Sequence, residues 1–369
     1  MLGVSRILYG GSVAARMCRN YLPCRWFASM TTSQSFSGIR NDDRKQSANK
    51  CAKLINRNII RVSGRDASDL LQGLITNDAS LLTRQNPSLY TMLLNQQGRV
   101  LYDAIIYGIY KEGNDEAVYL VECENELAPE LQKHMKMFKI RKKVDILNVS
   151  SEYEVWAAYE VFGKVDYPTS MVNESICVAD PRLSTFGRRL VVPKNTNLPE
   201  LIPGLTEMDV HNYHTHRYIH GICEGSNDLP VGNALPLESN LDYMNGVSFH
   251  KGCYLGQELT ARTHHTGVIR KRLMPVTLTN YENDAIINGN TTVSTKNGKN
   301  AGKFRNHIGI YGLALLRIAH TQGILTVPSA DGNLITLEPS VPKWWPHQSM
   351  DSIPKLHSEQ FSAGSEMKN

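Results

Sequence analysis

The feature that most constrains the fold is a pair of apolar segments joined by a very short turn. The spans 89–94 and 100–110 are rich in aliphatic and aromatic residues, and the turn residues Asn95-Gln96-Gln97-Gly98 lie between them. A third span of the same kind follows at 117–123. Antiparallel strands can be joined by turns this short, whereas a parallel crossover needs a dozen or more residues. The sequence therefore predicts an antiparallel sheet.

Helical segments alternate with further strand patterns around this sheet. Apolar residues recur at helical spacing after Asp66 and again over 127–138. Further strands are predicted at 58–62, 144–149 and 155–157, and a second helical stretch at about 206–222 leads into a long ordered loop at 225–240. This alternation indicates an α+β domain, which we expect to span residues 51–270.

The sequence changes character after residue 270. Short β-rich spans are separated by turns with the pattern Asn-Gly or Asp-Gly, which favour hairpins. The spans are 273–279, 291–295, 308–319, 322–327 and 333–337. We predict a small β-barrel-like domain at 271–340, followed by a polar, disordered tail at 341–369.

The N-terminal region carries the excess positive charge of the chain. Residues 1–41 contain no acid, and their basic residues are Arg6, Arg16, Arg19, Arg25 and Arg40. Removing these five from the 40 lysines and arginines leaves 35, which equals the 35 aspartates and glutamates, so the charge does not indicate nucleic-acid binding. Arginine-rich, acid-free N-termini are typical of mitochondrial presequences, although a disordered basic tail is the alternative.

We therefore predict a presequence at 1–27 and import into the mitochondrial matrix. Arg25 lies three residues before Ala28, a spacing found at matrix-processing sites, and the polar span 28–50 is expected to be a disordered lead-in. No uninterrupted apolar run approaches the roughly 18 residues that span a bilayer, so no membrane partner is expected.

Cysteine spacing excludes two common kinds of site. The chain has seven cysteines, of which Cys18 and Cys24 lie in the predicted presequence. The other five are Cys51, Cys123, Cys177, Cys223 and Cys253. No two of the seven form a C-x-x-C pair, so neither a structural zinc site nor a disulfide framework is indicated in a reducing compartment.

One cysteine lies in a segment with unusual chemistry at the junction of the two predicted domains. Gly252 and Gly256 are expected to let the backbone turn sharply and another molecule approach Cys253. Lys251, Arg262 and nearby imidazoles would favour the thiolate, which binds metals or acts as a nucleophile. The alternative is a buried, inert cysteine in a structural turn. The other residues expected to support the loop are Tyr254, Gln257, Glu258, His264 and His265.

Four histidines in the second helical stretch also suggest a metal site. His211 and His214 share one helix face and His216 and His220 share another, because successive residues are about 100° apart. The two pairs cannot converge on one ion, so we do not assign a metal site to them.

Several motifs together resemble the YgfZ branch of the T-protein (aminomethyltransferase) superfamily. They are the span 217–221, D-L-P-V-G-N-A-L-P-L-E at 228–238, K-G-C-Y-L-G-Q-E at 251–258, N-Q-Q-G-R-V-L-Y-D at 95–103 and G-L-A-L-L-R at 312–317. The resemblance covers roughly residues 58–346. It implies a T-protein-like, folate-binding type of fold with a C-terminal barrel.

The resemblance also implies a function late in iron–sulfur cluster assembly. Members of this branch act in the matrix with A-type iron–sulfur carrier proteins to make [4Fe–4S] clusters for client apoenzymes such as aconitase and lipoate synthase. A cluster normally takes four protein ligands, mostly thiolates, and Cys253 has no neighbouring cysteine. We therefore expect a cluster shared with a partner. His264 or His265 could tune the thiolate or supply a further ligand, although surface polar histidines are the commoner alternative.

The alternative is folate-dependent one-carbon transfer, the ancestral chemistry of the superfamily. Such transferases carry an acidic doublet where this chain has Tyr102-Asp103, and their loop lacks the cysteine. Asp103 and Glu238 could still line a cavity for tetrahydrofolate, although an acid in a strand is as often structural. No catalytic residue is assigned.

Overall fold

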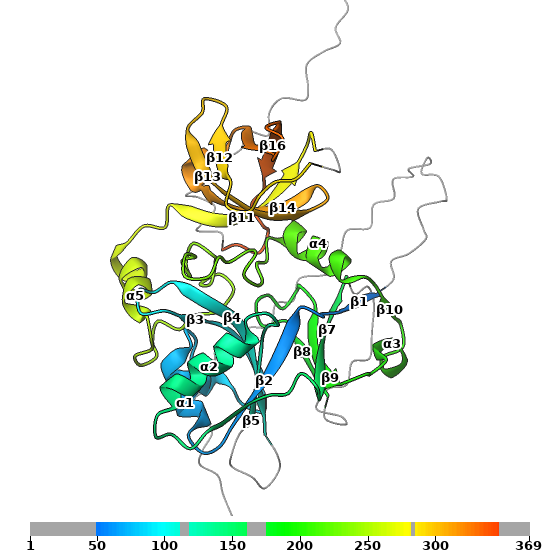
Figure 1. The fold of residues 1–369 in the computed structure, drawn as a ribbon, viewed down its shortest axis with the longest axis vertical. Coiled ribbons are helices and arrows are strands. Elements are labelled where there is room, and N and C mark those ends of the chain that lie inside the picture. The colour runs from blue at the N-terminus through cyan, green and yellow to red at the C-terminus, as the bar shows by residue number, and fades with distance from the viewer. Residues whose placement is uncertain (1–48, 111–117, 161–174, 282–284, 347–369) are drawn as a thin grey trace, which may run out of the picture. The chain divides into compact units, whose positions relative to one another are not determined.

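The structure is a computed structural model that describes residues 49–110, 118–160, 175–281 and 285–346 (Figure 1). The predicted presequence at 1–27, the processing site at Ala28 and most of the lead-in at 28–50 lie outside these ranges. The first strand, β1 (Asn49–Lys53), includes the last two residues of that lead-in, so ordered structure begins slightly earlier than expected.

The predicted antiparallel sheet is present. Its strand order is β3 (Ser88–Leu94), β4 (Val100–Ile109), β5 (Val118–Glu124), β2 (Arg57–Ser63) and β6 (Asp145–Asn148). All four pairings are antiparallel. The turn between β3 and β4 is closed by the Gly98 amide, which donates to the Asn95 carbonyl at 2.9 Å, and Gly98 has a φ of 75°. The hairpin prediction is confirmed.

Successive side chains of a strand point to opposite faces of a sheet. Both faces of this sheet are buried. On β4, Ala104 and Ile106 pack with the helices α1 (Ala67–Leu74) and α2 (Ala128–Lys139), while Ile105 and Tyr107 pack toward a second sheet. The helices contribute Leu70, Leu71, Leu74, Leu131 and Met135 to the first of these cores. A 3₁₀ turn, η1 (Ala79–Leu81), follows α1.

The second sheet is mixed. Its strand order is β10 (Leu205–Glu207), β1, β7 (Tyr153–Tyr159), β9 (Arg188–Pro193) and β8 (Ile176–Ala179), and only the β1–β10 pair is parallel among the described strands. Its outer face is covered by a small core that includes Leu198 of the short helix α3 (Leu198–Leu201).

The helix predicted from residue 206 begins later. Thr206 pairs with Lys50 in β10, and α4 (Val210–His220) starts after Asp209, whose carboxylate accepts from the His211 amide at 2.8 Å. The span 206–209 was therefore assigned wrongly, because a pairing partner more than 150 residues away determines its conformation. The predicted loop at 225–240 contains no helix or strand.

A closed six-stranded barrel follows helix α5 (Gln257–Thr266). Its order is β11 (Lys271–Leu278), β14 (Tyr311–Arg317), β13 (Asn300–Ile308), β12 (Thr292–Thr295), β15 (Leu325–Pro328) and β16 (Leu334–Pro339), and β16 pairs with β11. A 3₁₀ turn, η2 (Ile318–His320), follows β14. The strand β13 was not predicted from the sequence, because its pairing with β14 shifts register between Phe304 and Asn306 and this shift interrupts the alternation of apolar residues.

The beginning of the predicted tail at 341–369 is packed rather than free. Trp345 is 2% exposed in the barrel core and contacts Tyr243 with ring centroids 5.4 Å apart. The Trp344 indole donates to the His220 carbonyl at 2.8 Å. The tryptophans therefore tie the chain after β16 to α4 and to the barrel. Within the described ranges, no helix has the length and apolar character needed to cross a membrane.

Candidate functional site

Cys253 differs from the other cysteines in its access to solvent. Cys51, Cys123 and Cys223 are buried and Cys177 is half-buried, whereas Cys253 is exposed. Burial raises the pKa of Cys51 and of Cys123 to about 12, so their thiols stay protonated. Of the cysteines in the described part of the chain, Cys253 alone is exposed to a partner molecule.

Lys251 anchors the loop that carries Cys253. Its ammonium donates to the carbonyls of Gln72 at 2.8 Å, Ile75 at 2.8 Å and Asn77 at 2.6 Å, all in the segment where α1 ends. Burial lowers the pKa of Lys251 to about 8, and the Asp78 carboxylate opposes this shift. Lys251 was predicted to stabilise the thiolate; its ammonium instead donates to three backbone carbonyls, which fixes the loop in place.

The residues after Cys253 hold the loop from the other side. Tyr254 packs against the core between the two sheets, and Leu255 packs against the helical core. The Tyr254 amide donates to Oε1 of Gln257 at 3.1 Å. Cys253 therefore lies exposed between anchored neighbours, so its position is set before any partner binds.

The two glycines of the loop have different roles. Gly256 has a φ of 78°, and a Cβ there would lie 2.2 Å from the Asn95 carbonyl oxygen, so only glycine fits against the β3–β4 turn. A Cβ on Gly252 would meet nothing within 4 Å, and the φ of Gly252 is not positive. The predicted sharp turn therefore requires Gly256, while Gly252 leaves open space beside Cys253.

The polar residues that follow lie on or next to α5. Glu258, Arg262, His264 and His265 are exposed, and the His264 ring stacks on Phe249 with centroids 3.5 Å apart and an interplanar angle of 8°. Across the described ranges, no group of three or more histidine, cysteine, aspartate or glutamate side chains could hold a metal ion. The loop thus presents one thiol, with His264 packed against an aromatic ring.

The four histidines of α4 serve packing and hydrogen bonding. The rings of His216 and His220 lie 4.2 Å apart, and His214 accepts at Nδ1 from Arg217 Nε at 3.2 Å. Burial lowers the pKa of His214 and of His216 to about 4, so both rings are neutral near neutral pH. A neutral ring is what the Arg217 contact requires.

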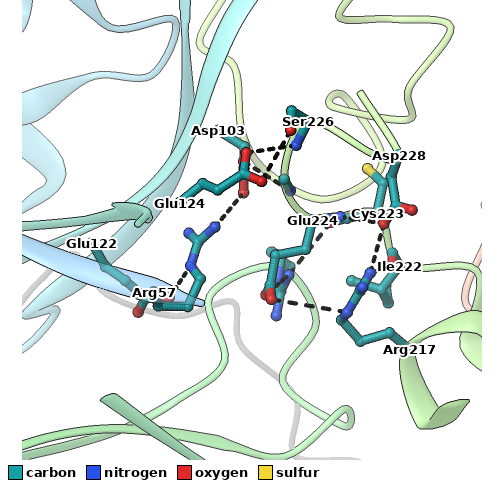
Figure 2. Close-up of polar contacts among 12 residues, drawn as sticks. Arg57, Asp103, Glu122, Glu124, Arg217, Ile222, Cys223, Glu224, Ser226 and Asp228 are labelled. Atoms are coloured by element: carbon teal, nitrogen blue, oxygen red, sulfur yellow. Dashed lines mark hydrogen bonds and ion pairs between the residues drawn. The ribbon is translucent and has the colours of Figure 1, made fainter. Parts of the chain in front are cut away.

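Asp103 lies in a buried network of charges, as Figure 2 shows. It is 5% exposed; one carboxylate oxygen accepts from the Gly225 amide at 3.0 Å and the other pairs with Arg57 at 3.3 Å. Arg57 also donates from Nε to Glu122 at 2.8 Å. Both oxygens of Asp103 are thus occupied by groups of the chain itself.

The network continues through residues that the sequence analysis did not assign. Glu224 is fully buried and pairs with Arg182 at 2.9 Å and with Arg189 at 2.5 Å. Burial alone would raise the pKa of Glu224, but Arg189 and Arg182 hold it well below its usual range. Arg217 pairs with Asp228 at 2.7 Å beside them. The sequence signal for these residues was a charged residue beside apolar residues within a strand, such as Glu122 in β5 and Arg189 in β9.

Glu238 lies outside the buried network of charges around Asp103. It lines a cavity of about 370 Å³ together with side chains of α5, and pairs with Lys271 at 3.4 Å. Asp103 does not line that cavity. Asp103 and Glu238 therefore do not share this cavity.

Comparison with known proteins identifies the family. Residues 270–347 match the family model described as the C-terminal β-barrel domain of CAF17. The mitochondrial iron–sulfur cluster assembly factor IBA57 of Homo sapiens is 42% identical over 307 residues, which cover 80% of this chain and 85% of that protein. Its counterpart in Mus musculus is 40% identical over 353 residues, covering 92% and 98%. The chain belongs to the IBA57 family of iron–sulfur cluster assembly factors.

The fold is that of the larger superfamily. The crystal structure of the glycine cleavage system aminomethyltransferase T from Bartonella henselae matches with a TM-score of 0.63 and 13% identity, covering 80% of this chain and 86% of that one. The predicted α+β, T-protein-like fold with a C-terminal barrel is confirmed. The predicted mitochondrial location agrees with the names of the IBA57 relatives, and the predicted membership of the iron–sulfur branch is confirmed.

Proposed function

We propose that the chain is a mitochondrial matrix assembly factor for [4Fe–4S] clusters and that Cys253 supplies one ligand to a cluster shared with an A-type carrier protein. The observation that carries this proposal is the exposed thiol of Cys253 on a loop anchored by Lys251 and Tyr254. Membership in the IBA57 family supports iron–sulfur cluster assembly as the general role.

The remaining ligands must come from the partner. An iron–sulfur cluster takes four protein ligands, mostly thiolates. The other cysteines of the described ranges are buried or half-buried, and no cluster of potential ligands surrounds Cys253 there. One exposed cysteine suits a single ligand to a cluster that the partner otherwise holds in a transient complex, from which the cluster passes to client apoenzymes such as aconitase and lipoate synthase.

Folate-dependent aminomethyl transfer is the second candidate, favoured by the fold shared with aminomethyltransferase T. Two observations disfavour it: Tyr102 stands where such enzymes have a carboxylate, and Asp103 is already bonded to Arg57 and to the Gly225 amide. Little negative charge is left for proton transfer or for stabilising a developing cation. Turnover of an aminomethyl donor with tetrahydrofolate, abolished in Asp103→Asn, would reverse this ranking.

The main experiment is anaerobic mixing of the purified protein with an A-type carrier, iron and sulfide. The expected result is a coloured complex that neither protein gives alone, lost in Cys253→Ser because serine is a poor iron ligand. Cys177→Ser is the matched control, since Cys177 is half-buried in β8. A Cys253→Ser protein that melts like the wild type, still forms the complex and still matures aconitase would rule the mechanism out.

A further inference from the structure

A preformed groove lies beside the helix that follows Cys253. This cavity of about 370 Å³, called the α5 groove below, is lined by residues of α5, of the loop before residue 240 and of the segment that leads into β11. Its apolar lining consists of Leu235, Pro236, Leu237, Leu259, Val268 and Ile269. Val268 is 76% exposed, so aliphatic surface is available to a visiting molecule.

The walls of the α5 groove are held by hydrogen bonds of the chain itself. The Leu273 amide donates to the Glu238 carbonyl at 2.8 Å, and the Ile318 amide donates to the Arg270 carbonyl at 3.0 Å. Arg272 donates to the Leu237 carbonyl at 2.7 Å. A binding site fixed in this way loses little conformational entropy when it is filled.

The α5 groove carries an excess of positive charge. Arg270, Lys271 and Arg317 line it, and Glu238 is its one carboxylate. Lys271 pairs with Glu238 at 3.4 Å. Within the ranges that the structure describes, neither the Arg270 nor the Arg317 guanidinium has a hydrogen-bond or ion-pair partner. A free guanidinium presents a planar fork that matches a carboxylate.

We propose that the α5 groove receives an acidic and aliphatic segment of the cluster-carrying partner and so places the thiolates of that partner beside Cys253. The inference rests on the proposed function and adds the docking surface. Exposed aliphatic surface next to two unpaired guanidinium groups fits a segment with apolar side chains and carboxylates. Leu259 and Thr263 of α5 line the groove, and α5 begins four residues after Cys253.

Docking is measured without the cluster, so that it is separated from metal ligation. The full chain is titrated with a purified apo A-type carrier in the absence of iron and sulfide, by biolayer interferometry at two salt concentrations. We expect Val268→Asp, and separately the double variant Arg270→Ala with Arg317→Ala, to weaken binding by about tenfold or more. The affinity of the double arginine variant should also depend less on salt concentration than the affinity of the Val268→Asp variant.

Ile324→Asp is the matched control. Ile324 is 57% exposed on the barrel and does not line the α5 groove, so the same change of an aliphatic residue to a carboxylate should leave the affinity within about twofold of wild type. Circular dichroism and melting temperatures confirm that each variant folds.

The outcomes separate this inference from the proposed function. Wild-type affinity in both the Val268 variant and the double arginine variant, or no measurable binding of the apo carrier by the wild-type chain, overturns the docking surface. Cys253→Ser should keep the apo-carrier affinity within about twofold and lose only the shared cluster. A shared cluster retained in Cys253→Ser overturns the proposed function and leaves the docking result standing.

Discussion

The substitution Lys251→Met tests whether the cysteine loop is held by a single lysine. Methionine has a similar length and keeps the apolar stem, but it removes the ammonium that donates to Gln72, Ile75 and Asn77. Hydrogen bonds to a charged group contribute about 1.5 kcal/mol each at the lower end, which gives about 4.5 kcal/mol for the three. Lys251 is half-buried, so water can replace part of this hydrogen-bond energy, and we expect the free energy of unfolding to fall by about 3 kcal/mol.

The assay for Lys251→Met combines thermal unfolding with amide hydrogen exchange. A loss of this size corresponds to a melting temperature lower by about 6 °C, with faster exchange concentrated in residues 247–256. Lys299→Met, which changes an exposed lysine of the barrel, should leave both unchanged. The reasoning is refuted if Lys251→Met melts and exchanges like the wild type, because the three hydrogen bonds would then contribute nothing to the loop.

Two further predictions concern a glycine of the loop and a histidine of α4. Gly256→Ala should lower the free energy of unfolding by about 1 kcal/mol or more and slow cluster sharing, because the φ of 78° and the contact with Asn95 exclude a Cβ at Gly256. Gly252→Ala should be neutral, and equal melting temperatures for the two variants would contradict this prediction. Burial lowers the pKa of His214 from 6.5 to about 4. Between these pH values the unfolded chain binds a proton at His214 that the folded chain does not, so the free energy of unfolding falls as the pH falls from 6.5 to 4. In His214→Gln, the difference between the free energies of unfolding at pH 7 and pH 4.5, measured with urea, should be smaller than in the wild type by no more than about 3 kcal/mol. An unchanged difference would argue against a lowered pKa of His214.

Local periodicity made much of the fold predictable. The turn at 95–98 and the apolar spacing of α1 identify the first sheet and its helix, because both depend on neighbouring residues. The strand β10 has three residues and exists through its pairing with β1, and β13 breaks its alternation at a register shift. Features fixed by distant partners leave little trace in a local pattern.

The same distinction applies to the site. Cys253 and its glycines stand together in the sequence, so the loop could be found from the sequence. The pairing within the buried network could not be predicted, because Arg57, Glu122 and Glu224 come from β2, β5 and the loop after α4 and meet only in the folded chain. The role of Lys251 was missed for the same reason, since its partners are backbone carbonyls almost 180 residues earlier.

The most direct test of the account is the reactivity of Cys253 toward alkylation in the complex with an A-type carrier. Mass spectrometry after a short pulse of iodoacetamide measures labelling of Cys253 in the free chain, with the apo carrier and with the cluster-loaded carrier. Cys253 should react in the free chain and with the apo carrier, and it should be protected when the cluster is present, because a cysteine bound to iron is unavailable. Equal labelling with the apo and the loaded carrier would contradict ligation by Cys253.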